Sequence, residues 1–394
     1  MTGTTAPGPR LAVFYGAVFG AVGIQLPFWP VWLEARGLDA GAIGLVLAAG
    51  LWARVAFSPV AAWIADRSGE RRRVMVGLAA GAVVAAALFA LAHGFWPILA
   101  LTALTAACFT ALMPLGDNLT MLHARRGAVD YGRVRLWGSL TFILAAVLGG
   151  RLVGYGGADV ILVLLVGTYA LVLLACLLLP KAEPGAPDGS DPVRPSGVRR
   201  LLTDPRFLLL LASAGLIQAS HSAYYGFATL HWHAAGLSGP VIGWLWAEGV
   251  IAEIVLFALA GRLAPRIGPA PLLALAGALT VARWVGTGLS TDLALLALMQ
   301  ALHAASFGAC HLAVMHKIRD EVAPDLQASA QGAYASLSAL LFGVLTPLSG
   351  RLYGAFAGGA FLAMAATALA GTALALALRA APSREAQPRA GPGS

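Results

Sequence analysis

The sequence predicts an all-α polytopic membrane protein whose twelve hydrophobic helices form two parallel repeats of six. Of its 394 residues, 59% are hydrophobic and only 11% are charged, a composition too apolar for a soluble domain. Apolar runs of about 20 residues, the length needed to cross a bilayer, recur along the chain. The two halves also align with one another when one is shifted by 199 residues.

Twelve apolar runs are long enough to be membrane-spanning helices. The first is expected to be a helix of the protein, because it is long, contains Pro27 and Pro30 and lacks the small-residue cleavage site of a signal peptide. The predicted units are a six-helix bundle (1–180), a Pro-, Gly- and Arg-rich cytoplasmic linker that does not pack (181–206), a second bundle (207–381) and a disordered tail (382–394). The spans lie at roughly 11–34, 40–65, 74–92, 96–122, 135–155, 159–180, 207–232, 240–262, 271–289, 292–316, 331–356 and 358–379.

The formal net charge of +8 indicates membrane topology and not nucleic-acid binding. Of the 26 Lys and Arg residues, 21 lie on the side that holds both termini and the loops after the even-numbered spans. Only Arg36, Arg151 and Arg351 lie at the opposite ends, while Arg54 and Arg283 fall inside spans. This positive-inside pattern predicts a multi-pass protein of the cytoplasmic (inner) membrane, with both termini in the cytoplasm.

An internal repeat relates residues 31–69 to residues 230–268 without gaps. Twelve of these 39 positions are identical, and several of the shared residues are glycines. Two parallel six-helix halves follow, with a binding site expected at the interface between them. The alignment also places Arg54 opposite Glu253, so opposite charges occupy equivalent positions in the middle of the second and eighth spans.

The loop after the second span contains an Asp-Arg pair, a glycine and further arginines, which is the loop motif of the major facilitator superfamily. In such a loop, the aspartate can cap a neighbouring helix and an arginine can hold a gate on the cytoplasmic side. A generic basic loop would explain the arginines but not the Asp-Arg-x-Gly spacing. The second copy of the motif keeps its frame but has Pro265 in place of the aspartate. The expected gating residues are Asp66, Arg67, Gly69, Arg71 and Arg266.

An acid and a base lie in the predicted fourth and fifth spans, on either side of the basic turn near Arg126. Asp117 and Arg135 are each nine positions from that turn, so both are expected about 13 Å into the membrane on antiparallel neighbours. Charges at this depth are costly unless they pair or bind a polar substrate. Alternatively, Arg135 belongs to the basic loop and its side chain extends to lipid phosphate.

Other polar residues in the spans are candidates for a central site. Gln25 and Trp29 lie one turn apart on the first span, and Tyr225 is on the seventh. His303 and His311 share a face of the tenth span. Each either forms a hydrogen bond to a neighbouring helix or takes part in a proton route with Glu253 and Arg283.

The sequence gives no sign of metal or cysteine chemistry. Cys108, Cys176 and Cys310 lie in apolar spans, no Cys pair has metal-ligand spacing, and the two histidines of the tenth span do not form a His-Glu-x-x-His site. No nucleophile and base lie at catalytic spacing either. We therefore expect no metal, no cofactor and no enzymatic activity. A membrane sensor would account for the helices but not for the charges inside them.

Several motifs resemble the proton-coupled permeases of the major facilitator superfamily that include lactose permease, and more closely the 3-phenylpropionate permease family. In the N-terminal half, the resemblance rests on Tyr131-Gly-Arg-Val-Arg135-Leu-Trp137-Gly-Ser139, with Asp117 where lactose permease has Glu. It covers residues 11–380 and implies one chain that acts alone, by alternating access, to import a small aromatic carboxylate with protons. The motifs of the second half are Tyr224-Tyr225-Gly-Phe227, Ala252-Glu253, Arg283-Trp284, His303 and Cys310-His311-Leu312-Ala313.

The expected roles divide into substrate binding and proton coupling. Arginines suit carboxylates because their fork binds both oxygens, and aromatic side chains suit a ring. Sugar or nucleoside symport stays open, as does drug/proton antiport, although the fifth span has no proline for the Gly-Pro-Gly-Gly motif of such antiporters. The substrate-binding candidates are Gln25, Trp29, Arg54, Asp117, Arg135, Tyr225 and Phe307, and the proton-coupling candidates are Glu253, Arg283, His303 and His311.

Overall fold

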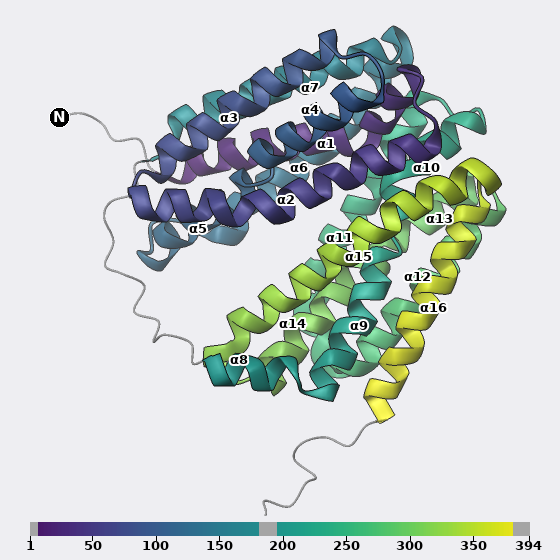
Figure 1. Ribbon diagram of the computed structural model, residues 1–394. Coiled ribbons are helices and arrows are strands. Elements are labelled where there is room, and N and C mark those ends of the chain that lie inside the picture. The colour runs from purple at the N-terminus through teal and green to yellow at the C-terminus, as the bar shows by residue number, and fades with distance from the viewer. Residues whose placement is uncertain (1–6, 181–194, 381–394) are drawn as a thin grey trace, which may run out of the picture.

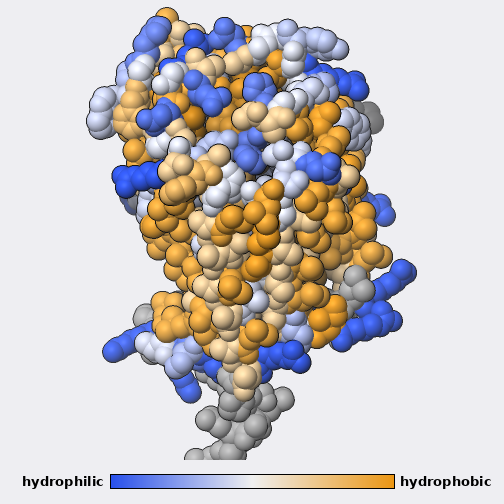
Figure 2. Space-filling view, turned by 90° about the vertical axis from the view of Figure 1, so that its right-hand side faces the viewer, coloured by the Kyte–Doolittle hydropathy of each residue, from blue (hydrophilic) through white to orange (hydrophobic). Residues whose placement is uncertain are grey.

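The computed structural model describes residues 7–180 and 195–380, and within these ranges it is helical with no strand. Twelve helical segments are long and apolar enough to cross a membrane, as the sequence predicts. Many large apolar side chains on them are exposed, such as Leu144 and Val163. On the face shown in Figure 2, apolar residues form a band across the middle of the molecule, with polar residues toward both ends. This is the surface of a protein that lies in lipid.

The helices follow in two groups, one before and one after the residues 181–194, which are outside the described ranges (Figure 1). The first group consists of α1 (Pro7–Ala35), α2 (Ala40–Ser68), α3 (Arg71–Leu88) with the short η1 (Phe89–Leu91), α4 (Phe95–Phe109), α5 (Leu112–Arg125), α6 (Tyr131–Gly156) and α7 (Asp159–Leu178). The second consists of α8 (Pro195–Leu202), α9 (Pro205–Ala219), α10 (Ser222–Ala234), α11 (Gly239–Ile267), α12 (Pro269–Leu289), α13 (Leu293–Ala301), η2 (Ala304–Ala309), α14 (Cys310–Glu321), η3 (Pro324–Leu326), α15 (Gln327–Phe356) and α16 (Gly359–Ala380).

The repeat predicted from the sequence is present in the structure. Helices α2 and α11 both have 29 residues and begin 199 positions apart. The turns before them use Gly37 and Gly236, with φ of 82° and 86°, and the turns after them use Gly69 and Gly268, with φ of 66° and 77°. Only glycine adopts this backbone region without strain, which explains why glycines are among the residues that the two copies share.

Three spans are interrupted near their middle. The fourth is divided into α4 and α5, the seventh into α9 and α10, and the tenth contains the π-helical η2. At the first break, Pro114 has no N–H for the carbonyl of Thr110, and the Thr110 hydroxyl donates to the Ala106 carbonyl at 2.7 Å. At the second, Ser220 and Ser222 donate to backbone carbonyls at 2.7 Å. Such side-chain bonds compete with the helix, and interrupted helices frequently form binding sites in transporters.

The two bundles are in backbone contact at one end of the molecule. A Cβ atom on Gly150 of α6 would lie 2.3 Å from the carbonyl oxygen of Gly239 on α11. On the other pair of helices, a Cβ on Gly350 of α15 would lie 2.4 Å from the carbonyl oxygen of Ala40 on α2. Toward the opposite end, which carries the α2–α3 and α5–α6 turns and α8, the bundles spread apart (Figure 1). We call this opposite end the basic end, after its arginines.

The linker differs from the prediction where the structure describes it. Residues 195–202 form helix α8, and Leu201 packs against the apolar core of the second bundle. The first membrane helix of that bundle already begins at Pro205, with Asp204 capping it through a bond from the Arg206 N–H at 2.9 Å. The prediction that this part of the linker does not pack was therefore wrong, because Leu201 buries an apolar side chain there. The rest of the linker, 181–194, and the tail lie outside the described residues.

Candidate functional site

In the first bundle, Asp117 is held by two tyrosines. The hydroxyls of Tyr15 and Tyr131 donate to its Oδ1 atom at 2.6 Å and 3.1 Å. These three residues come from α1, α5 and α6, so the carboxylate joins three helices. Charge-assisted bonds of this length are the stronger kind, and they orient the carboxylate while Oδ2 has no hydrogen bond among the described residues.

Arg135 lies beside this cluster but forms no ion pair with Asp117 in the described part of the chain. Its guanidinium carbon lies 3.9 Å from the centre of the Phe19 ring and 5.6 Å from that of Tyr15. A Cβ on Gly138 would lie 3.2 Å from its Nη1 atom. Gly138 is about one turn further from the basic end, so the guanidinium extends into the span and not back to the surface. This geometry argues against the alternative in which Arg135 reaches lipid phosphate.

In the second bundle, Arg283 is buried with 0% exposure and bonded to uncharged groups. Its Nε donates to the Met299 carbonyl at 2.9 Å, its Nη1 to His303 Nδ1 and Ser306 Oγ at 3.0 Å, and its Nη2 to Gln300 Oε1 at 3.0 Å. Its guanidinium also lies over the rings of Tyr224 and Trp284, at 4.4 Å and 4.5 Å. Four neutral acceptors and two rings thus surround the charge, and among the described residues it has no ion pair with a carboxylate.

The same network determines which ring nitrogen carries the proton in His303 and in His221. Arginine only donates hydrogen bonds, so His303 Nδ1 is an acceptor and the proton of the neutral ring is on Nε2. His221 has the opposite arrangement, because its Nδ1 faces the carbonyls of Gln218 and Ile217, at 3.0 Å and 3.3 Å, and must donate. Its Nε2 lies 3.2 Å from Ser306 Oγ. Ser306 therefore links Arg283 to His221.

Glu253 lies between the two clusters. On its own helix α11, Gly249 leaves room for His303, whose ring carbon lies 3.4 Å from the Cβ position of that glycine. The Cγ of Glu253 itself lies 3.4 Å from the Cβ position of Gly308 in η2. It is half-buried and within electrostatic range of Arg135 in the other bundle. A charge in each bundle therefore faces the interface that the repeat predicts.

The structure places some candidates elsewhere. Trp29 is only 3% exposed and stacks on Trp32 with ring centres 4.6 Å apart, so it belongs to a packed aromatic cluster. Gln25 accepts a bond from Tyr169 at 3.1 Å. Arg54 is exposed in the middle of α2, and no hydrogen bond or ion pair of its side chain occurs among the described residues. His311 contacts Tyr334, with ring centres 6.2 Å apart, and does not contact Arg283.

Tyr225 and Phe307 lie around His221. Their ring centres are 5.9 Å and 6.0 Å from that of His221, and Phe307 stacks on His303 at 5.5 Å. Both are half-buried, so each keeps part of its ring free for a ligand. The interface thus has aromatic rings beside charges in both bundles.

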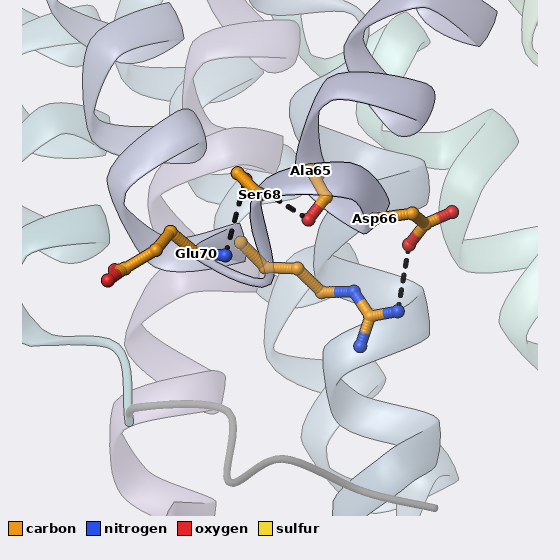
Figure 3. A network of polar contacts seen from close by, with 5 residues as sticks. Ala65, Asp66, Ser68 and Glu70 are labelled. Carbon is orange, nitrogen blue, oxygen red and sulfur yellow. Dashed lines mark hydrogen bonds and ion pairs between the residues drawn. The ribbon is translucent and has the colours of Figure 1, made fainter. Parts of the chain in front are cut away.

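The α2–α3 loop forms a local network (Figure 3). Asp66 accepts a bond from Arg71 at 2.8 Å, while the Ser68 hydroxyl donates to the Ala65 carbonyl and accepts from the Glu70 N–H, both at 3.3 Å. Asp66 therefore pairs with the first residue of α3, and the α3 N-cap is Glu70. Of the other gating candidates, Arg67 near the end of α2 lies over the Trp63 ring at 5.4 Å, and Arg266 near the end of α11 donates to the Arg262 carbonyl at 2.9 Å.

Sequence reasoning did not single out three of these side chains: Tyr15, Phe19 and Ser306. Tyr15 and Phe19 are one turn apart on α1, as Gln25 and Trp29 are, and their ring types are common in any apolar span. Ser306 lies three residues after His303, which places it near the same face of the helix. That spacing was the available signal, but a serine in a membrane helix commonly bonds its own backbone.

The comparisons with known proteins agree with this architecture. A family model described as "MFS_1 like family" matches residues 9–370. The chain is 38% identical over 314 residues to a "Probable 3-phenylpropionic acid transporter" of Escherichia coli (strain K12), covering 78% of this chain and 81% of that one. It is 32% identical over 293 residues to a "Maltose permease" of Geobacillus stearothermophilus, covering 72% and 71%.

Solved structures show the same fold. The nucleoside transporter NupG matches with a TM-score of 0.83 at 14% identity, over 96% of this chain and 100% of that one. A bacterial homologue of the lysosomal transporter Spinster, in an inward-facing and unoccupied conformation, matches with a TM-score of 0.76 at 17% identity, over 94% and 96%. These relatives are transporters and not enzymes. The chain belongs to the MFS_1 like family, and it is a multi-pass membrane transporter of the major facilitator superfamily.

Proposed function

We propose that the protein imports a small aromatic carboxylate together with a proton, as a single chain, across the inner membrane. The observation that carries this proposal is the position of Arg135 near the start of α6: its guanidinium is half-buried, lies beside two aromatic rings, has no ion pair in the described structure and has Glu253 of the other bundle within electrostatic range. The similarity to a probable 3-phenylpropionic acid transporter supports this substrate class.

Arg135 binds the carboxylate in this proposal. Its fork can bond both oxygens, while Phe19 and Tyr15, and across the interface Tyr225 and Phe307, offer faces and edges to the substrate ring. Asp117 cannot bind a carboxylate favourably, so its free Oδ2 would accept a bond only from an aromatic acid that also carries a hydroxyl, which 3-phenylpropionate does not. Arg54, exposed in the middle of α2, would attract an anion toward the interface from outside the two clusters. Gln25 would add a polar group on α1 if it released Tyr169.

Glu253 is the proposed proton carrier. An anion bound to Arg135 adds negative charge within range of the Glu253 carboxylate, so binding of the anion and protonation of Glu253 favour one another. The two together add no net charge to the apolar interior, where a net charge is costly. His303, whose ring packs against Gly249 of the same helix as Glu253, and its partner Arg283 would respond to the proton indirectly. His311, away from this network, would have at most an indirect role.

Alternating access would come from rocking of the two bundles. The glycine contacts of α6 with α11 and of α2 with α15 close one end, and the bundles spread toward the basic end (Figure 1). By the positive-inside rule, the basic end is cytoplasmic, which would make this an inward-facing state with both termini in the cytoplasm. The α2–α3 loop, with its Asp66–Arg71 pair, lies at the moving end and suits a gate.

A second candidate substrate class is a sugar or nucleoside. The tyrosine-held carboxylate of Asp117 is a good acceptor for hydroxyl groups, and a maltose permease is among the relatives. A drug/proton antiporter has less support, because the fifth span lacks the proline of that group's motif.

The experiment is uptake of labelled 3-phenylpropionate into proteoliposomes, with and without an inward proton gradient. We expect accumulation only with the gradient, and loss of it in Arg135→Gln. Arg133→Gln is the matched control, because Arg133 is exposed on the same helix. Uptake that is insensitive to the gradient would refute proton coupling. Uptake of maltose or a nucleoside in place of the aromatic acid would select the second candidate.

A further inference from the structure

A cavity outside the proposed transport site lies at the basic end of the second bundle. Its volume is ≈ 340 Å³, and it is formed by α8, the start of α9, the end of α14 and the loop to α15. Figure 1 shows α8 at this end, beside the end of α14. Gly197 of α8 packs against Leu326, the Cβ position of the glycine being 3.2 Å from that side chain. The linker helix therefore forms one wall of the cavity.

The polar lining of the cavity has more cations than anions. Arg200, Arg206 and Lys317 face two carboxylates, Asp204 and Glu321, which leaves a net charge of +1. Lys317 is only 4% exposed and pairs with Glu321, and Arg206 lies 3.8 Å from the same carboxylate. Glu321 thus lies close to two cations, of which Lys317 is desolvated. A ligand with a single negative charge would make the lining neutral.

The rest of the lining is apolar and continues onto the lipid-facing surface. Leu201, Phe207 and Leu210 line the cavity, and the neighbouring Leu202 and Leu208 are exposed. Helix α8 combines Arg199 and Arg200 with Val198, Leu201 and Leu202, the composition of a helix that lies in the membrane interface. Basic residues at the basic end of the molecule, next to exposed apolar side chains, suit a lipid headgroup whose acyl chains lie along those side chains.

We propose that this cavity binds the headgroup of an anionic phospholipid with one phosphodiester charge, such as phosphatidylglycerol. Arg200 at the mouth and Lys317 inside would hold the phosphate, and the acyl chains would lie along Leu202 and Leu208. The bound lipid would fix α8, and with it the connection between the two bundles, against the inner leaflet. This proposal rests on the membrane topology of the proposed function, in which the basic end faces the cytoplasm.

The test is native mass spectrometry of the purified, delipidated full-length protein with phosphatidylglycerol or phosphatidylcholine at equal concentration. We expect preferential retention of phosphatidylglycerol, and a loss of about fivefold in Arg200→Gln, the effect of removing one partly exposed charged contact. Arg199→Gln, a change of the adjacent arginine that does not line the cavity, is the matched control and should bind as the wild type does. Lys317→Gln should lose more of the bound phosphatidylglycerol. Because Lys317 is in a buried ion pair and Arg200 is exposed, Arg200→Gln is the variant whose folding does not depend on such a pair.

Three outcomes would overturn the proposal: equal retention of the two lipids, equal losses in Arg199→Gln and Arg200→Gln, or displacement of the lipid by millimolar inorganic phosphate, which would identify a soluble anion as the ligand. The readout does not involve transport. Failure of lipid binding with intact proton-driven uptake would refute this inference alone, and failure of uptake with selective lipid binding would refute the proposed function alone.

Discussion

The backbone contact between Gly150 and Gly239 gives a direct test of the proposed transport cycle. In Gly150→Ala, the new methyl group would lie 2.3 Å from the Gly239 carbonyl oxygen and 3.1 Å from the Cα atom of Gly243. Both neighbours are backbone atoms and cannot rotate away, so α6 and α11 must separate at this end. Overpacking of this kind costs about 1–3 kcal/mol. In the proposed cycle the contact is broken in the outward-facing state, so the cost would fall on the inward-facing state alone.

A difference of this size shifts the ratio of the two states by about 5- to 150-fold toward the outward-facing one. The assay is labelling of a single reporter cysteine, Leu47→Cys, in a background without Cys108, Cys176 and Cys310, with a membrane-impermeant maleimide added from outside. Leu47 is half-buried against Gly226 of the other bundle, and it becomes reachable when that end opens. We expect faster labelling and slower uptake in Gly150→Ala.

The matched control is Gly167→Ala, because Gly167 is also inside a membrane helix but a Cβ there meets no atom within 4 Å. It should label and transport as the wild type does. Unchanged labelling in Gly150→Ala, with the protein folded, would refute the view that these glycines close the outer end.

Three further predictions concern the polar clusters. In Glu253→Gln, uptake against a substrate gradient should be abolished while exchange of internal for external substrate continues, because the proton carrier is lost but the binding site is not. Concentrative uptake by this variant would contradict the coupling role of Glu253. In Tyr15→Phe, loss of the 2.6 Å bond to Asp117 frees the carboxylate to rotate. The affinity for a hydroxylated substrate, measured by calorimetry, should then fall by about tenfold, the effect of one charge-assisted bond. An unchanged affinity would show that Asp117 does not contact the substrate hydroxyl. In Ser306→Ala, Arg283 and His221 both lose a buried partner, so the free energy of unfolding should fall by about 2–4 kcal/mol. Ser222→Ala is the control, because it removes a buried hydroxyl that bonds only the nearby Ala219 carbonyl, at 2.7 Å. A melting temperature of Ser306→Ala no lower than that of this control would disprove the importance of the network.

The predicted fold agrees closely with the structure where the sequence carries a strong physical signal. The twelve spans, the 199-residue repeat and the conserved frame of the turn glycines were all readable, since lipid requires long apolar helices and left-handed turns require glycine. The interruptions of the fourth, seventh and tenth spans were not predicted. Pro114 and the serines at 220 and 222 were visible, but the same residues are tolerated inside continuous membrane helices when neighbours satisfy the backbone.

The candidate site was predicted in part. Counting residues identified Asp117, Arg135 and Glu253 as charges within helices, and their roles stay proposals. The expected equal depth of Asp117 and Arg135 was wrong: Asp117 lies eight residues before the end of α5, whereas Arg135 is the fifth residue of α6, because α6 begins only at Tyr131. Residue spacing did not identify the side chain that contacts each charge. Asp117 bonds Tyr15 and Tyr131, Arg135 lies on Phe19, and Trp29 packs against Trp32. These contacts depend on how α1 is rotated against α5, α6 and its other neighbours.

The sequence by itself determined that the chain crosses a membrane twelve times in two related halves, because hydropathy and glycine turns are local properties of short segments. Only the tertiary structure decided which side chains share the interface between the halves. It surrounded Arg283 with neutral acceptors, joined it to His221 through Ser306, and brought Glu253 within range of Arg135. Those arrangements arise from the rotation and approach of helices far apart in the chain, which side-chain packing fixes and residue spacing does not encode.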